Sequence, residues 1–168
     1  MAKRKVLLMT LAHHYAGTVL EESDYGWHLD KDAIIIFGGG CTGEIVSSSG
    51  LIFTNHHCGY GAIAAASSVE NNYLRDGFYA KSHQEEIQTS LSVQFLVRIE
   101  DVTKEVMDSL NGLSGADRVK KQTAVLAAIN KRMSDAGNSI ETRVSPLFKG
   151  NQFLAFVYQR YSDIRLVG

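Results

Sequence analysis

The strongest restriction on the fold of this chain comes from two short apolar runs that follow each other in the sequence. Residues 43–47 and 50–54 are separated by two serines, and a glycine closes the turn between them. Two such runs around a short polar turn are typical of a β-hairpin. Cys41 and Cys58 bracket this hairpin, since one precedes the first run and the other follows the second. The two cysteines are therefore predicted to lie close enough for a disulfide.

Further strands are expected on both sides of a helical stretch. Residues 33–37 form a β-branched run that ends at three glycines, which predicts a buried strand. Alternation over residues 92–99 predicts a strand with one strongly apolar face. Residues 103–137 carry apolar side chains at helical spacing and are predicted to be mainly helical and to stand apart from the strands. Strand character returns over three later segments, residues 143–148, 152–161 and 164–167.

Composition excludes several classes of protein. The chain has 168 residues, of which 45% are hydrophobic and 21% are charged, as in an ordinary globular domain. The formal net charge is −1 and the longest basic run is the triplet at residues 3–5, so no nucleic-acid partner is predicted. No apolar run approaches the roughly 18 residues of a membrane span. A membrane-spanning protein is therefore not expected.

The first 31 residues have two interpretations. A basic start is followed by an apolar stretch at residues 6–12, which is typical of a secretory signal peptide. His13 and His14 interrupt that stretch, and the same residues are compatible with a plain N-terminal strand or helix. A shorter helix is expected further along, over residues 62–72. The two interpretations of residues 1–31, a signal peptide with a polar lead-in or ordinary structure, both stay open.

The candidate reactive residues lie at the end of the hairpin, where His56 and His57 precede Cys58. Adjacent residues leave a strand in opposite directions, so the two histidines are poorly arranged to bind one zinc ion. A redox pair would be expected to show Cys-x-x-Cys spacing, which Cys41 and Cys58 lack. A structural disulfide beside a positioned histidine fits better, although a lone histidine is usually a surface or core residue. No metal or cofactor is predicted, and the residues alone leave a catalytic role for His57 open.

The wider pattern resembles a known family. The blocks FGGGCTGEIVS at residues 37–47 and GLIFTNHHCGY at residues 50–60 resemble the bacterial dipeptidyl-peptidase family of types 7 and 11. The resemblance extends through further blocks in the same order, at residues 67–70, 73–78, 98–103 and 163–168. Taken together, these blocks span residues 32–168, and the two hairpin blocks are highly specific.

The resemblance implies a fold that is mainly β with helices. Residues 32–102 are expected to form the first part of the N-terminal β-barrel of a chymotrypsin-like double β-barrel. Residues 103–137 would begin a helical cap domain, and residues 138–168 would return to the barrel. Residues 1–31 lie outside the resemblance.

The resemblance also implies an activity and a site. The expected function is a serine-type dipeptidyl aminopeptidase that releases dipeptides from oligopeptide substrates with a free N-terminus. His57 matches the general base, which takes the proton of a serine hydroxyl and returns it to the leaving amine. A periplasmic or cell-surface location is implied, and the resemblance allows a homodimer of the full-length enzyme.

The chain departs from the family in lacking two members of the catalytic triad. The family's aspartate and serine lie beyond the segment matched by residue 168. The serines at residues 47–49 are expected to belong to a turn, and Asp101 and Asp163 to strand ends. The chain is therefore expected to be the N-terminal portion of a longer enzyme and inactive alone. Two alternatives remain, a non-enzymatic secreted β-barrel binding module and a fragment of a chymotrypsin-like endopeptidase.

Overall fold

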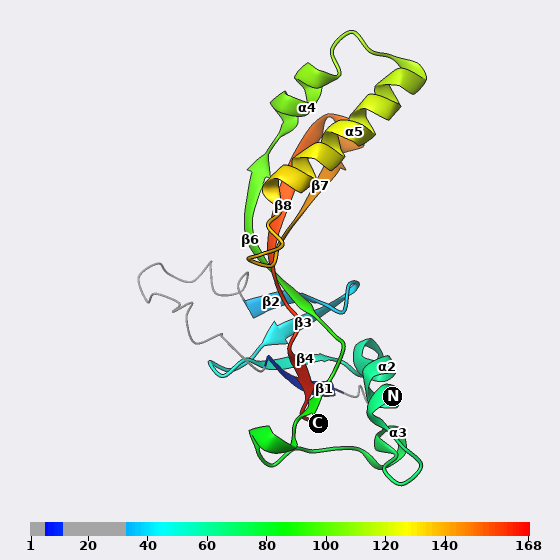
Figure 1. Cartoon of the computed structure of the whole chain (residues 1–168), viewed down its shortest axis with the longest axis vertical. Helices are drawn as coiled ribbons and strands as arrows, with labels where there is room; N and C mark the ends of the chain where they lie inside the picture. Colours follow the sequence, from blue (N-terminus) through cyan, green and yellow to red (C-terminus); the bar gives the residue numbers. More distant parts are fainter. Residues whose placement is uncertain (1–5, 12–32) are drawn as a thin grey trace. The chain divides into compact units, whose positions relative to one another are not determined.

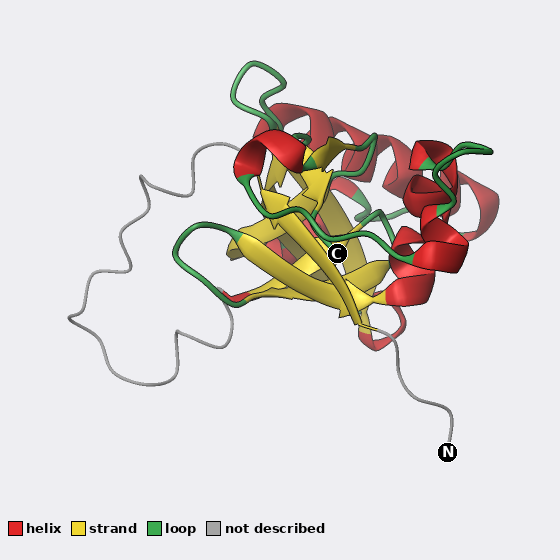
Figure 2. Cartoon of the chain, turned by 90° about the horizontal axis from the view of Figure 1, so that it is seen from below, coloured by secondary structure: helices red, strands yellow, loops and turns green. Residues whose placement is uncertain are grey.

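The structure is a computed structural model that describes residues 6–11 and 33–168. It combines helices with antiparallel strands (Figure 2). The chain divides into two compact units. Unit 1 comprises Met1–Phe95 and Tyr161–Gly168, and unit 2 comprises Leu96–Arg160. The candidate site lies in unit 1.

The described part of unit 1 is built on an antiparallel sheet (Figure 1). Its neighbouring strands follow the order β5-β9-β1-β4-β3-β2-β6. The strands are β1 (Val6–Leu11), β2 (Ile34–Phe37), β3 (Cys41–Ile45), β4 (Leu51–Asn55), β5 (Ile87–Gln88), β6 (Val93–Asp101) and β9 (Ile164–Leu166). β6 begins in unit 1 and continues into unit 2. Residues 6–11 thus form a strand. The other residues to which the signal-peptide interpretation applies, 1–5 and 12–31, lie outside the described residues.

The hairpin predicted from the two apolar runs is confirmed. β3 and β4 pair antiparallel, with Gly43 opposite Thr54 and Ile45 opposite Ile52. The turn is closed by the amide of Gly50, which donates to the carbonyl of Ser47. Gly50 has a φ of 81°, a conformation that glycine adopts without steric cost. Because β4 ends at Asn55, the histidines follow at the end of the hairpin opposite the turn.

The core of unit 1 lies between the sheet and a helix that starts at the histidines. The helices of this unit are α2 (His56–Ala66), α3 (Tyr73–Asp76) and the 3-10 turn η2 (His83–Glu85). Ile63 of α2 packs with buried strand residues that include Phe37 and Ile52. The helix expected over residues 62–72 therefore begins earlier and ends at Ala66. Gly59 and Gly61 lower the helix propensity of its first turns, so the sequence gives little sign of its start.

Unit 2 packs two helices on one face of a sheet (Figure 1). The described strands follow the order β6-β8-β7. Val106, Leu110 and Ile129 are buried in a cluster that also holds Phe153 and Ala155 of β8. Pro146 is tolerated because β7 is the edge strand. The elements of this unit, besides β6, are α4 (Thr103–Ser109), α5 (Gly115–Met133), β7 (Ile140–Leu147), the 3-10 turn η3 (Phe148–Gly150) and β8 (Gln152–Tyr161).

The helices of unit 2 differ from expectation in their packing. Both lie within residues 103–137, where the residue spacing predicts helix, but they cover strands rather than stand apart from them. The division of the chain also differs, because β7 and most of β8 group with these helices instead of with the strands of unit 1. Val97 and Ile99, expected on a strongly apolar face, are about half exposed. In the part of the chain that the structure describes, no helix has both the length and the apolar character to cross a membrane.

Candidate active site

His57 sits in the first turn of α2, immediately after β4. Asn55 has extended backbone angles, and the chain turns into the helix at His56. Because both histidines lie in a helical turn, their side chains do not point to opposite faces as those of adjacent strand residues do. His57 is exposed, whereas His56 is half-buried. An exposed imidazole at the end of a paired strand is accessible to a substrate.

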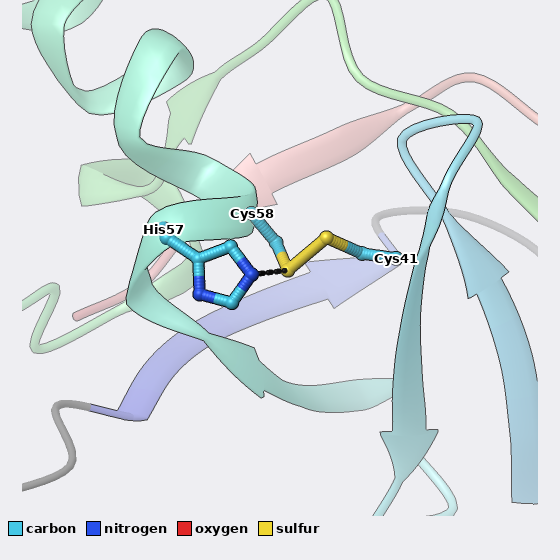
Figure 3. A group of neighbouring side chains, drawn as sticks. All are labelled: Cys41, His57 and Cys58. Atoms are coloured by element: carbon cyan, nitrogen blue, oxygen red, sulfur yellow. Dashed lines mark hydrogen bonds between the residues drawn. A yellow bond between two sulfur atoms is a disulfide. The ribbon is translucent and has the colours of Figure 1, made fainter.

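A disulfide fixes the first turn of α2 to the neighbouring strand (Figure 3). The Sγ atoms of Cys41 and Cys58 are bonded at 2.12 Å, and the Cα atoms lie 6.1 Å apart. The predicted pairing of the two cysteines is therefore confirmed. Because Cys41 begins β3 and Cys58 follows His57 directly, the bond limits the movement of the backbone that carries the imidazole.

The imidazole itself contacts the disulfide. Nε2 of His57 lies 3.5 Å from Sγ of Cys58. Figure 3 marks this contact with a dashed line. Sulfur is a weak hydrogen-bond acceptor, so this contact orients the ring without holding it strongly. Among the described residues, this sulfur is the hydrogen-bond partner of the His57 ring.

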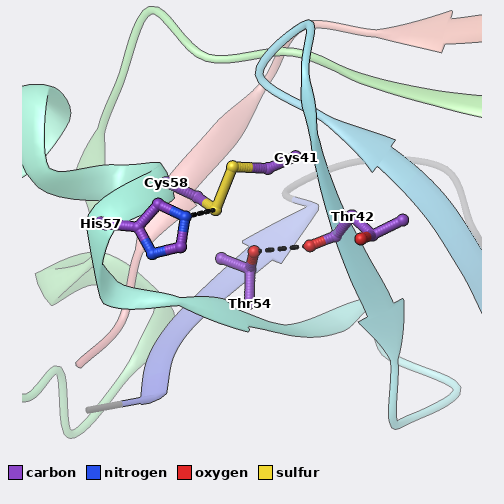
Figure 4. Close-up of a disulfide and its surroundings, with 5 residues drawn as sticks. All are labelled: Cys41, Thr42, Thr54, His57 and Cys58. Carbon is purple, nitrogen blue, oxygen red and sulfur yellow. Dashed lines mark hydrogen bonds between the residues drawn. A yellow bond between two sulfur atoms is a disulfide. The ribbon is translucent and has the colours of Figure 1, made fainter. Parts of the chain in front are cut away.

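The strands beneath His57 are joined by a buried hydroxyl (Figure 4). The hydroxyl of Thr54 donates to the carbonyl oxygen of Thr42 at 2.8 Å, and Thr54 is only 7% exposed. This bond ties β4 to β3 before His57 in the sequence, and the disulfide ties the first turn of α2 to β3 after it. The backbone on both sides of His57 is thereby held to β3, by a hydrogen bond on one side and by the disulfide on the other.

His56 belongs to a different surface from its neighbour. Its ring makes an edge-on contact with Tyr60, with the ring centroids 5.9 Å apart. His56 also lines a pocket of about 420 Å³ in unit 1, with Tyr73, Phe78 and the Arg75–Asp76 pair on other walls. The Arg75 guanidinium beside Asp76 holds the pKa of that carboxyl below its usual range. The two histidines therefore have different surroundings, since His56 lines the pocket and His57 contacts the disulfide.

The serines of the hairpin are far from His57. Ser47 and Ser49 share a hydrogen bond in the turn, and the amide of Leu51 donates to Oγ of Ser47. At about 3.3 Å per residue, the five residues of β4 place the turn roughly 16 Å from the end that leads into α2. These serines thus have a structural role in the turn and lie out of reach of the His57 ring.

The two aspartates at strand ends also have other partners. Asp163 pairs with Arg165 of β9 at 3.2 Å. Asp101 accepts a hydrogen bond from the amide of Thr103. Hydrogen bonding to the Thr103 side chain, and then to this amide, lowers the pKa of Asp101. The site in the described residues therefore comprises a positioned histidine and a disulfide. The sulfur contact of His57 and the pocket beside His56 were missed from sequence, because neither follows from spacing along a strand.

The described site is an exposed histidine beside a disulfide at the end of an antiparallel hairpin. A family model described as Peptidase S46 matches residues 22–168. The chain belongs to the Peptidase S46 family.

Curated relatives carry two kinds of name. The dipeptidyl-peptidase 7 of Capnocytophaga gingivalis is 44% identical over 140 residues, which are 82% of this chain and 19% of the relative. The Asp/Glu-specific dipeptidyl-peptidase of the same organism is 41% identical over 145 residues, covering 82% of this chain and 20% of the relative. The chain thus spans about a fifth of the length of these relatives.

A solved structure agrees with the fold. The crystal structure of Porphyromonas endodontalis DPP11 in complex with substrate matches with a TM-score of 0.72 and 33% identity. The match covers 90% of this chain and 24% of that chain. The mixed helical and antiparallel architecture is therefore shared with a dipeptidyl-peptidase of known structure.

Proposed function

We propose that this chain is the N-terminal portion of a serine-type dipeptidyl aminopeptidase, in which His57 is the general base. The observation that carries the proposal is the exposed His57 imidazole, held by the Cys41–Cys58 disulfide at the end of the hairpin. Membership of the Peptidase S46 family and the names of the relatives support the reaction class. The substrates are oligopeptides with a free N-terminus, and the products are dipeptides.

The mechanism needs a neutral imidazole at His57. In that form the ring takes the proton of a serine hydroxyl while the oxygen attacks the scissile carbonyl, and then returns it to the leaving amine. The serine, and the aspartate that would orient the ring, are proposed to come from a part of the enzyme that follows residue 168. This agrees with the turn position of Ser47 and Ser49 and with the pairing of Asp163 to Arg165.

The proposal includes the fold and location of the longer enzyme. The strands of unit 1 would be the first part of a chymotrypsin-like double β-barrel, and the helices of unit 2 would begin the cap domain. We place the enzyme in the periplasm or at the cell surface. The disulfide supports this location, because disulfides persist in oxidising compartments.

Relatives named for Asp/Glu specificity and relatives named dipeptidyl-peptidase 7 match the chain almost equally well. Similarity over the matched segment therefore does not distinguish the two kinds of relative.

The test uses the complete reading frame that encodes this chain. The purified protein is incubated with a hexapeptide and with the same peptide acetylated at its N-terminus, and the products are identified by mass spectrometry. Dipeptide release from the free peptide alone is expected. Cleavage inside both peptides would instead support an endopeptidase, and cleavage of neither, over a panel with acidic and apolar second residues, would support a binding module.

A further inference from the structure

An asparagine–glycine pair lies in the turn that joins α4 to α5 (Figure 1). α4 ends at Ser109 and α5 begins at Gly115, so Asn111 and Gly112 lie between them, and both are exposed. Of the asparagines in the sequence, Asn111 is the one that a glycine follows. An asparagine in this position can react with the backbone nitrogen of the next residue, because glycine has no side chain to block the approach.

The turn leaves both reacting groups free. Gly112 has a φ of 73°, and nothing lies within 4 Å of the position of an added Cβ atom. Within the described part of the chain, no hydrogen bond holds the Asn111 side chain or the Gly112 amide. The ends of the turn are anchored, since the amide of Leu113 donates to the carbonyl oxygen of Leu110 and Leu110 is fully buried. The pair can therefore react without breaking the contacts that anchor the turn.

Other asparagines of unit 2 have side chains that are engaged. The side-chain amide of Asn138 donates to Asp135 at 2.6 Å. In α5, Oδ1 of Asn130 accepts a hydrogen bond from the amide of Val144 at 2.8 Å. Such bonds restrain a side chain that must rotate to meet the backbone nitrogen. Asn111 combines an unrestrained side chain with the least hindered neighbour.

We propose that Asn111 is a site of spontaneous deamidation and isoaspartate formation, with the Gly112 backbone nitrogen as the nucleophile. This nitrogen attacks the side-chain carbonyl carbon of Asn111, the C–N bond of the side-chain amide breaks, and ammonia leaves with the proton of the Gly112 amide. A succinimide ring remains, and water adds to either of its two carbonyl groups. Opening one C–N bond of the ring gives aspartate. Opening the other gives isoaspartate, in which the main chain runs through the side-chain carbon.

Both products change the junction between the two helices. The new carboxylate stands at the carboxyl end of α4, where a negative charge is unfavourable. It follows directly after Leu110, whose carbonyl oxygen accepts a hydrogen bond from Arg118 of α5. Isoaspartate also lengthens the main chain between the helices by one carbon. The modification falls in unit 2, whereas His57 lies in unit 1, so the proposal is independent of the proposed function.

The test incubates the protein from the complete reading frame at mildly alkaline pH and follows two tryptic peptides by mass spectrometry. Residues 105–118 contain Asn111 as their only asparagine, and residues 133–143 contain Asn138 as theirs. We expect the amide-to-carboxyl conversion to be several-fold faster in the first peptide, with two products of equal mass that separate by chromatography. Equal rates at the two asparagines, or aspartate as the sole product, would overturn the proposal.

Gly112→Asp identifies the nucleophile. Aspartate adopts the left-handed conformation of this turn more readily than most residues do, but its side chain hinders the attack. Conversion of Asn111 should therefore slow several-fold. Gly77→Asp is the matched control, because it places the same residue at another left-handed glycine with free space, and the rate at Asn111 should not change. An unchanged rate in Gly112→Asp, or equal slowing in both variants, would contradict the role of Gly112.

A second incubation in urea separates the folded turn from the unfolded chain, with circular dichroism to report folding. The rate at Asn138 should rise in urea, because its bond to Asp135 is lost, while the rate at Asn111 should change little. Reaction of Asn111 in urea alone would overturn the proposal, since the folded turn would then protect it. Peptidase activity is not the readout, so a failed dipeptidase assay leaves this result standing.

Discussion

At the scale of single residues, Gly43 shows how tightly the strands beneath His57 are packed. A Cβ atom at this position would lie 3.1 Å from the carbonyl oxygen of Phe53 and 3.2 Å from Cγ2 of Ile52. Backbone and β-branched neighbours cannot move away easily. Gly43→Ala should therefore destabilise the chain by about 1–3 kcal/mol, measured by urea unfolding.

Gly40→Ala is the matched control for this substitution. Gly40 lies in the preceding turn, its φ is outside the left-handed region, and nothing stands within 4 Å of the added Cβ. Its effect should stay within about 0.5 kcal/mol. Equal effects of the two substitutions would show that crowding at Gly43 is not what requires glycine there.

The residues of the site were predictable to different degrees. The pairing of Cys41 with Cys58 follows from the hairpin, because a turn of fixed length brings its two ends together. The contact between Nε2 of His57 and sulfur does not follow, since it depends on where a helix begins. The choice of His57 over His56 came from a family resemblance rather than from physical chemistry, and it stays a prediction.

At the scale of elements, α5 tests whether the helices of unit 2 are part of its core. Ile129 is 1% exposed and packs with Phe153 and Ala155 of β8. Ile129→Ala should cost about 2–5 kcal/mol, since it leaves a cavity between helix and sheet. Val119 lies on the same helix and is 67% exposed, so Val119→Ala should change the unfolding free energy by less than about 0.5 kcal/mol. Similar effects of both would contradict the packing of α5 on the sheet.

The two helices of unit 2 are also joined by an ion pair that responds to acid. Arg132 of α5 donates two hydrogen bonds to Glu105 of α4, at 2.7 and 2.8 Å. These bonds lower the pKa of Glu105 in the folded chain. The pair thus stabilises the fold above about pH 4.3, the ordinary value for glutamate, and this contribution is lost as the pH falls through the lowered pKa.

Glu105→Gln measures that contribution. The pair is partly exposed, so its value is at most about 1 kcal/mol at pH 7. We expect the variant to be less stable than the original chain at pH 7, by urea unfolding, and the difference to be lost as the pH falls through the lowered pKa of Glu105. Glu44→Gln removes an exposed carboxylate of β3 and is the control, which should change the free energy of unfolding at pH 7 by less than about 0.5 kcal/mol. A Glu105→Gln defect that stays the same size as the pH is lowered would mean that the loss is one of packing.

Elements were predictable where one local pattern decides them. The segment 152–161 is a strand with the predicted bounds, because it is rich in aromatic residues and turn residues flank it on both sides. The start of α2 was missed, because His-His-Cys-Gly-Tyr-Gly has weak helix propensity and is held in place by a tertiary disulfide. Val97 and Ile99 alternate as a buried face would, but alternation does not show whether anything covers that face.

At the scale of the whole molecule, the chain spans about a fifth of its curated relatives. Alternation and spacing predict elements, but the grouping of β7 and β8 with the helices depends on long-range packing that no local pattern contains. The double β-barrel is likewise a prediction from resemblance, and the described residues provide the hairpin and the sheet on which it would be built.

We expect the 168-residue chain alone to release no dipeptides. Ser47 and Ser49 are hydrogen-bonded to each other within the β3–β4 turn, and Asp163 is paired with Arg165. The measurement is mass spectrometry of peptide digests with the purified, folded chain. Dipeptide release that disappears in the His57→Ala form of this same chain would show that its own residues complete the catalytic site.

The most direct test of His57 as the base compares two neighbouring substitutions in the complete enzyme. His57→Ala should lower kcat/KM for dipeptide release by roughly 10⁴- to 10⁶-fold while the circular dichroism spectrum is unchanged. His56→Ala should retain much more of the activity, because His56 lines the pocket and contacts Tyr60. Substantial turnover in His57→Ala, together with its loss in His56→Ala, would contradict the account and assign the base to the other histidine.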